Sequence, residues 1–352
     1  MSARSGGLVR AGFDEAGLGP TLGPLVVAGF ATAGTRGGDW GPCDDLRGPL
    51  AKLVGEPGCR DGRIEVGDSK KIHLGPRKLA RVERTALATV TWVHGRTPQT
   101  VGELLDLVAT PSFESDGDRR APWWSTLDER LPIECERAEI EQLGDDLGKL
   151  ARKVKIRPLW YRADVISAAR INREIAIEHR REGTKNTWAT HTVLRLAKLA
   201  VDQLDASQLA IWCDKAGGRS AYTEPLRRAF PELSAAAAHD MPLFGSPAIM
   251  LERLGEQSER SCYRMSSAAR RIELGFVMGG DICDPRISWA SILAKYLREL
   301  IMRSLNRHFA ARVPELRPTA GYPEDARRFI AEVEAALGEN GGLERAAWIR
   351  SL

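Results

Sequence analysis

The feature that most restricts the fold of this chain is a set of short apolar runs that each lead into an acidic residue. The run Leu8–Phe13 leads into the adjacent pair Asp14 and Glu15, and a second run, Leu25–Ala31, follows after a Gly/Pro-rich stretch. Apolar runs of this length, bounded by turn residues, are typical of buried strands. We therefore expect two strands joined by a tight connection, with both carboxylates where the first strand ends.

Two more acids follow apolar runs in the second half of the chain. The run Leu209–Cys213 ends at Asp214, and Ile272–Met278 leads through two glycines to Asp281. Residues 188–204 have apolar side chains at helical spacing, which predicts a helix that feeds the strand before Asp214. Asp281 likewise follows a predicted strand.

Each acid also has an ordinary structural explanation. A single Asp after a strand is usually a turn residue or a helix cap, and this alternative stays open for Asp214 and Asp281. The pair Asp14 and Glu15 is harder to explain in this way, because neighbouring side chains of an extended chain point to opposite faces. One of the two must meet the interior, where an unpaired carboxylate is costly.

Carboxylates at strand ends can converge on one edge of a sheet, where they repel one another and need cations. Two Mg²⁺ or Mn²⁺ ions about 3.5 to 4 Å apart, bridged by carboxylates, can activate a water and stabilise the leaving oxygen in phosphodiester hydrolysis. Hard oxygen ligands without His or Cys are the ligands that these ions prefer. Convergence of the acids therefore predicts a metal-dependent phosphodiesterase.

The remaining pattern predicts three further elements. The run Ala86–His94 favours a strand, and residues 324–337 favour a short amphipathic helix. Asp284 followed by Pro285 has the signature of an N-cap with proline at the first helical position, so we expect a long helix from Pro285 to about Arg312.

The chain is expected to fold around one large core with insertions. Its 352 residues exceed the length of about 250 to 300 residues at which single cores stop growing. The pattern is weak over residues 96–161, which we interpret as an insertion of unknown role. We place the catalytic core in residues 1–95 and 162–325 and a helical tail in residues 326–352. Tryptophans near the insertion are expected in the core, with base stacking as the alternative (Trp123, Trp124 and Trp160).

Composition excludes some classes of protein. The absence of a signal peptide and of a long apolar run predicts a cytoplasmic protein without membrane segments. The six cysteines lack zinc-site spacing, so we expect reduced thiols (Cys43, Cys59, Cys135, Cys213, Cys262 and Cys283). The net charge of +4 is too small to establish a nucleic-acid partner. Residues 260–312 hold ten basic and four acidic residues, an excess of 10 − 4 = 6 that fits either phosphate contacts or a solvated helix face.

Three ordered motifs resemble those of the type 2 ribonuclease H family, ribonucleases HII and HIII. They are G-F-D-E-A-G-L-G-P-T-L-G-P-L-V-V-A at Gly12–Ala28, G-D-S-K-K-I at Gly67–Ile72, and G-D-I-C-D-P-R-I-S-W-A-S-I-L-A-K at Gly280–Lys295. The G-Y-P at Gly321–Pro323 is similar to a fourth motif of the family. The resemblance implies a ribonuclease H-like α/β fold, in which a mixed central sheet is flanked by helices and interrupted by inserted segments.

The resemblance also implies an activity and a set of site residues. The activity is two-metal hydrolysis of the RNA strand of RNA/DNA hybrids, with Mg²⁺ or Mn²⁺ as cofactor and the hybrid as partner. Four carboxylates would be both catalytic and metal-binding (Asp14, Glu15, Asp214 and Asp281). The implied nucleic-acid contacts are two glycines, three lysines, a serine and a tyrosine (Gly17, Gly19, Lys70, Lys71, Ser291, Lys295 and Tyr322).

The chain departs from the family pattern at two places. The family's G-R-G is Gly17-Leu18-Gly19 here, and leucine cannot donate the hydrogen bonds by which arginine helps to recognise an RNA-to-DNA junction. The D-G-x expected at the third acid is replaced by Asp214-Lys215-Ala216-Gly217-Gly218. Two alternatives stay open: a catalytically silent nucleic-acid-binding protein of the same fold, and a related nuclease that acts on DNA or branched structures.

Overall fold

The computed structural model describes residues 7–34, 40, 46–75, 77–115, 117, 119–181, 184–215, 219–235, 249–267 and 269–351. Cys43 and the stretch Ala216–Gly218, both named above, lie outside the described residues. No helix in the described ranges has the length and apolar character needed to cross a membrane.

A seven-stranded sheet forms the centre of the molecule, in the order β5-β2-β1-β6-β9-β8-β7. Its central strands β1, β6 and β9 are parallel to one another, and the remaining pairs are antiparallel. The strands span β1 (Val9–Ala16), β2 (Leu25–Ala33), β5 (Arg157–Ile166), β6 (Gln208–Asp214), β7 (Met250–Glu256), β8 (Arg260–Ser266) and β9 (Arg271–Val277). The predicted mixed sheet flanked by helices is confirmed.

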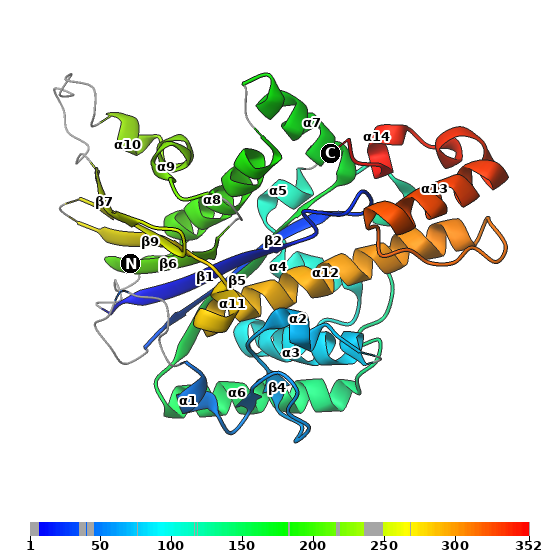
Figure 1. The fold of residues 1–352 in the computed structure, drawn as a ribbon. Helices are drawn as coiled ribbons and strands as arrows, with labels where there is room; N and C mark the ends of the chain where they lie inside the picture. The colour runs from blue at the N-terminus through cyan, green and yellow to red at the C-terminus, as the bar shows by residue number, and fades with distance from the viewer. Residues whose placement is uncertain are drawn as a thin grey trace.

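Helices cover both faces of this sheet (Figure 1). One face packs against α7 (Ala168–His179) and α8 (Lys185–Gln203), and the other packs against α12 (Pro285–Ala310). Behind α12 lie α3 (Lys78–His94) and α6 (Arg137–Lys153). Since β1 and β2 are covered on both sides, their side chains are nearly all buried.

Smaller elements complete the chain. Before α3 come α1 (Arg47–Leu50), β3 (Val54–Gly55), β4 (Ile64–Glu65) and α2 (Ser69–Ile72), and after it α4 (Val101–Val108), α5 (Pro111–Glu114) and η1 (Pro122–Trp124). The others are α9 (Thr223–Ala229), α10 (Glu232–Ala235), α11 (Gly280–Cys283), α13 (Pro323–Leu337), η2 (Glu339–Gly342) and α14 (Arg345–Trp348). Strands β3 and β4 form a separate two-stranded sheet.

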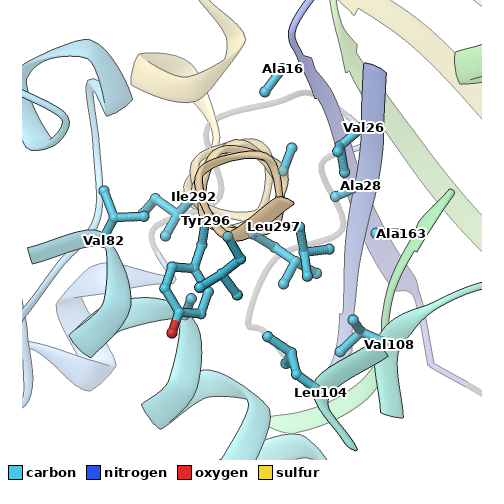
Figure 2. Close-up of a cluster of buried hydrophobic side chains, with 14 of the residues drawn as sticks. Ala16, Val26, Ala28, Val82, Leu104, Val108, Ala163, Ile292, Tyr296 and Leu297 are labelled. Carbon is cyan, nitrogen blue, oxygen red and sulfur yellow. The ribbon is translucent and has the colours of Figure 1, made fainter. Parts of the chain in front are cut away.

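Helix α12 confirms the helix predicted from Pro285, and it is buried on almost all sides. The Asp284 side chain accepts from the N–H of Arg286, which caps the helix as expected. Figure 2 shows the helix end-on, with Ile292 and Tyr296 on one side and Leu297 on another, among apolar side chains of the sheet, α3 and α4. The helix is therefore fixed from several directions, which positions the residues along it.

The strand predicted at Ala86–His94 is wrong, because this stretch is the second half of α3. All its residues from Ala86 to Trp92 are buried, between α12 and α6. A helix that is buried all round shows no amphipathic period, so its β-branched and apolar residues resemble a strand in sequence. Gly95, in the left-handed conformation with φ +70°, ends the helix.

Residues 96–161 are tied closely to the core. Side chains from α4 and α6, such as Leu104 and Leu147, belong to the same apolar cluster as α12. The edge strand β5 begins at Arg157, inside this segment, and pairs with β2. Trp123, Trp124 and Trp160 are buried, in agreement with their expected place in the core.

The basic stretch at residues 260–312 does not form one exposed surface. Arg286 and Arg298 are buried, and Arg264 and Arg271 both pair with Glu273. These four charges therefore serve the fold, so the excess of basic residues in the sequence does not correspond to one exposed face.

Candidate active site

Asp14 lies on the face of β1 that packs against α12. Along an extended strand, alternate residues share a face, so Asp14 shares its face with Gly12 and Ala16, while Glu15 shares the other with Phe13. Helix α12 approaches this face closely: a Cβ built on Gly12 would lie 2.3 Å from the backbone nitrogen of Ile287. Asp14 is buried and Glu15 is half-buried. Both lie within β1, which continues to Ala16, whereas the sequence predicted that the strand ends where the pair begins.

Asp214 ends β6, the parallel neighbour of β1. Phe13 pairs with Cys213, so Asp14 and Asp214 occupy the next positions on adjacent parallel strands. The N–H of Gly280 donates to Asp214 Oδ1 at 2.7 Å, which joins α11 to the end of β6. This contact brings Asp281, the next residue of α11, to the same edge of the sheet.

Ser69 connects Asp281 to the motif that begins at Gly67. Asp281 Oδ2 accepts from the Ser69 N–H at 2.9 Å and from its hydroxyl at 2.5 Å. Asp68 caps α2 by accepting from the N–H groups of Lys70 and Lys71. Ser69 was not among the site residues predicted from the sequence, although it lies inside the G-D-S-K-K-I motif. The spacing of a motif does not show which of its residues contacts the acids.

Lys295 is held beside the acids by two hydroxyl groups. Its Nζ donates to Ser291 Oγ at 2.6 Å and to Ser69 Oγ at 2.8 Å, and the two hydroxyls lie 3.0 Å apart. Ser291 is fully buried and Lys295 half-buried, one turn apart on α12, whereas Lys70 and Lys71 are exposed. Of the four residues expected beside phosphates at this site, Lys70 and Lys71 are therefore exposed to solvent, while Ser291 and Lys295 are not.

Burial, and to a smaller extent mutual repulsion, changes the ionisation of the acids. Burial raises the pKa of Asp14 to about 7, the charge of Asp214 adds to the rise, and Lys295 opposes it. Burial, with repulsion by Asp14 and Asp214, raises the pKa of Glu15 to about 8. The pKa of Asp214 is also raised, mainly by burial and further by Asp281. Four carboxylates therefore share an edge at which Lys295 compensates Asp14 and Glu15 and Lys70 compensates Asp214.

The donor set at this edge fits a hard divalent cation. In the part of the chain that the structure describes, no three His, Cys, Asp or Glu side chains are arranged to hold a metal ion. The carboxylates nevertheless disfavour each other's charged forms, which a divalent cation would relieve. The acidic side chains gathered here offer carboxylate oxygens, which are ligands suited to Mg²⁺ or Mn²⁺.

Gly17, Gly19 and Tyr322 lie together beyond the end of β1. The carbonyl of Gly321 accepts from the N–H groups of Thr21 and Leu22 at 2.8 and 3.2 Å, which places Tyr322 beside the loop at residues 17–24. Tyr322 is 57% exposed. Leu18, where the resemblance implies an arginine, packs against the apolar cluster between the sheet and helices α7 and α8.

Comparisons with known proteins give matches only at the level of structure. No protein-family model and no curated protein matches the sequence. The ribonuclease HII in a PCNA complex from Archaeoglobus fulgidus is 15% identical, with a TM-score of 0.39, and the alignment covers 97% of this chain and 94% of that one.

Two other solved structures are similar to the same degree. A mutant protein of Bst-RNase HIII is 16% identical with a TM-score of 0.42, over 98% of this chain and 66% of that one. Ribonuclease H2 from Pyrococcus horikoshii OT3 is 12% identical with a TM-score of 0.38, over 97% and 92%. Because the identities and TM-scores are low, this likeness carries no argument about activity, and we base the function on the chain's own residues.

Proposed function

We propose that this protein is a divalent-metal-dependent endonuclease that hydrolyses the RNA strand of RNA/DNA hybrids. The observation that carries the proposal is the gathering of Asp14, Glu15, Asp214 and Asp281 at one edge of the sheet, with their charges only partly compensated. A fold without a ligand gains nothing from such a cluster, because buried carboxylates are costly unless paired. The motifs that surround the four acids point to the same activity.

In this proposal the four carboxylates hold two ions of Mg²⁺ or Mn²⁺, which supply charge neutralisation and Lewis-acid activation of the phosphodiester when bound. Lys295, held by Ser69 and Ser291, keeps a positive charge beside Asp14. The same hydroxyl of Ser69 orients Asp281. The chain thereby fixes the direction of the acids before substrate arrives, which is the form of preorganisation that favours catalysis.

The proposed substrate path runs past both sides of the acids. Lys70 and Lys71 are exposed near Asp281 and would neutralise backbone phosphates, as lysines do in nucleic-acid complexes. Gly17, Gly19 and Tyr322 would meet the duplex at the other end. Because the Leu18 side chain packs against the apolar cluster and has no donor group, we propose that the enzyme acts on longer hybrids without requiring a single embedded ribonucleotide.

The test is cleavage of three labelled duplexes of one sequence: an RNA/DNA hybrid, a DNA duplex with one ribonucleotide, and plain DNA. Reactions contain Mg²⁺ or Mn²⁺, or a chelator. We expect cleavage of the hybrid that requires the cation and vanishes in Asp14→Asn. Asp106→Asn is the matched control, because Asp106 is an exposed acid on α4, away from the acidic edge. This variant should cleave the hybrid as the wild type does.

Other outcomes separate the alternatives. Binding of the hybrid in chelator, without cleavage in any cation, would identify a silent binding protein. Preferred cleavage of the plain DNA duplex would identify a nuclease of different specificity. Either result would contradict the proposed activity, and the binding assay makes the two distinguishable.

A further inference from the structure

The loop at residues 17–24, between β1 and β2, is held from beneath by two buried arginines. Arg298 of α12 donates from Nη1 to the carbonyl of Pro24 at 2.6 Å, and from Nη2 to that of Leu22 at 3.1 Å. Its Nη2 also donates to Ala320 at 3.0 Å, in the segment that leads to Tyr322. One side chain thus ties the loop to α12 and to the chain beside it.

Arg350 reaches the same loop from the C-terminal segment. Its Nε donates to the carbonyl of Gly23 at 2.7 Å, and its Nη1 to those of Gly17 at 2.5 Å and Pro20 at 3.1 Å. The backbone N–H of Arg350 donates to Thr21 at 2.9 Å. The segment itself is fixed by Asn172, whose Nδ2 donates to the carbonyl of Ile349 at 2.9 Å.

Together the two guanidinium groups bind the carbonyls of five of the eight loop residues (Gly17, Pro20, Leu22, Gly23 and Pro24). The N–H groups of Leu18 and Gly19 have no acceptor among the described residues, and Gly19 is exposed. Most of the loop's carbonyls are therefore bonded from inside, and two adjacent N–H groups are free, an arrangement suited to an anion.

The two guanidinium groups lack a carboxylate in direct contact among the described residues, and Glu299 acts on Arg298 without forming an ion pair. Arg298 is 7% and Arg350 4% exposed, and neither forms an ion pair with a carboxylate in the described part of the chain. Burial lowers the pKa of Arg298 to about 10, and burial with the nearby charge of Arg298 lowers the pKa of Arg350. Burial and the charge of Arg350 also lower the pKa of Lys185, at the start of α8.

Two buried cations that repel one another are a costly way to hold a loop, because neutral donors could satisfy the same carbonyls. We propose that Arg298 and Arg350 are positioning residues for the substrate: they fix the loop at residues 17–24 so that the N–H groups of Leu18 and Gly19 stay free, and they give the loop the positive potential that receives a phosphodiester of the duplex. This inference rests on the proposed function. It makes the last residues of the chain part of the substrate site.

The first test separates substrate binding from turnover. Arg350→Met should raise KM for the hybrid by about tenfold, equivalent to about 1.4 kcal/mol, while kcat at saturating substrate changes much less. Arg350→Lys keeps the charge and should restore part of the loss. Arg345→Met, in the same segment but exposed, is the matched control and should leave both constants unchanged.

The second test does not depend on activity. Hydrogen exchange of the peptides that cover residues 16–25, measured in chelator, should become faster in Arg350→Met and stay as in the wild type in Arg345→Met. If Arg350→Met does not fold, the same measurement on Arg350→Lys decides. Unchanged exchange together with an unchanged KM would overturn the inference. A variant whose kcat and stability fall as strongly as its KM rises would also overturn it, because a general loss of structure would then explain the defect. Faster loop exchange in a protein that cleaves no duplex would leave the loop's tether standing and reject the proposed function alone.

Discussion

Asp14 is a residue whose charge works against the fold. Its pKa, raised to about 7 mainly by burial, lies above the value of 3.8 expected in the unfolded chain. Between these pH values the folded state binds more protons, so the free energy of unfolding falls as pH rises through this window. Metal-free protein should therefore be less stable at pH 8 than its uncharged variant.

We predict that Asp14→Asn is more stable than the wild type at pH 8 in chelator, with a free energy of unfolding higher by on the order of 2 kcal/mol and a higher Tm. The difference in stability should shrink toward pH 5. Mn²⁺ should raise the Tm of the wild type at pH 8 and have little effect on the variant. Thermal unfolding at both pH values measures this, with Asp106→Asn as control. A variant less stable than the wild type at pH 8 would show that the carboxylate is instead stabilising.

Glu83 is a buried acid with a different task. Its carboxylate accepts the N–H groups of Ile133, Glu134 and Cys135, at 2.7 to 2.8 Å, and the hydroxyl of Tyr296 at 2.8 Å. It thereby joins α3 and the loop before α6 to α12, at the residue that follows Lys295.

Glu83→Gln replaces one acceptor oxygen by a donor that faces N–H groups, so it should cost about 3 kcal/mol of stability. Urea unfolding at pH 7 measures the loss. Glu136→Gln, an exposed acid on the same loop, should change stability by less than about 0.5 kcal/mol. Equal stability of the two variants would contradict the role given to Glu83.

At the scale of elements, the contact between β1 and α12 decides how the acids meet Lys295. Gly12 has no space for a Cβ, which would lie 2.3 Å from the nitrogen of Ile287 and 2.5 Å from the carbonyl carbon of Arg286. These neighbours are backbone atoms at the start of α12, so they can make room only if the helix moves.

We predict that Gly12→Ala lowers the free energy of unfolding by about 1 to 3 kcal/mol and reduces cleavage, because the first turn of α12 and α11 must shift. Gly255→Ala, at a position with nothing within 4 Å of the added Cβ, should leave both unchanged. Unfolding in urea and hybrid cleavage measure the two effects. Full stability of Gly12→Ala would mean that the close approach is not needed.

At the scale of the whole molecule, residues 96–161 share a core with the rest. Leu104, Ile140 and Leu147 belong to the apolar cluster around α12, and losing them would expose that helix to water. A chain in which a Gly/Ser linker replaces residues 98–155 should therefore lose its cooperative thermal transition and its near-UV circular dichroism. The same linker inserted after Gly117, an exposed turn position, should preserve both. A sharp transition in the deleted chain would show an independent insertion.

The sequence by itself determined the elements whose signals are local. Strands β1, β2, β6 and β9 follow from apolar runs with turn residues at their ends, and α8, α12 and α13 follow from helical periodicity or from the cap at Asp284. The candidate acids follow from their places after those strands and from the motifs around them. The edge strand β7 and its neighbour β8 gave no such signal, because β7 is largely exposed and β8 alternates between buried and half-buried residues, so neither contains a continuous apolar run.

The tertiary structure decided which of these residues meet. The sequence did not show that the second half of α3 is helical, because burial from several sides removes the periodicity that would reveal it there. Nor did it show that Ser69 links Asp281 to Lys295, or that Arg298 and Arg350 hold one loop, since these partners are far apart along the chain. Such contacts depend on how strands and helices pack, and packing joins residues that no local pattern relates.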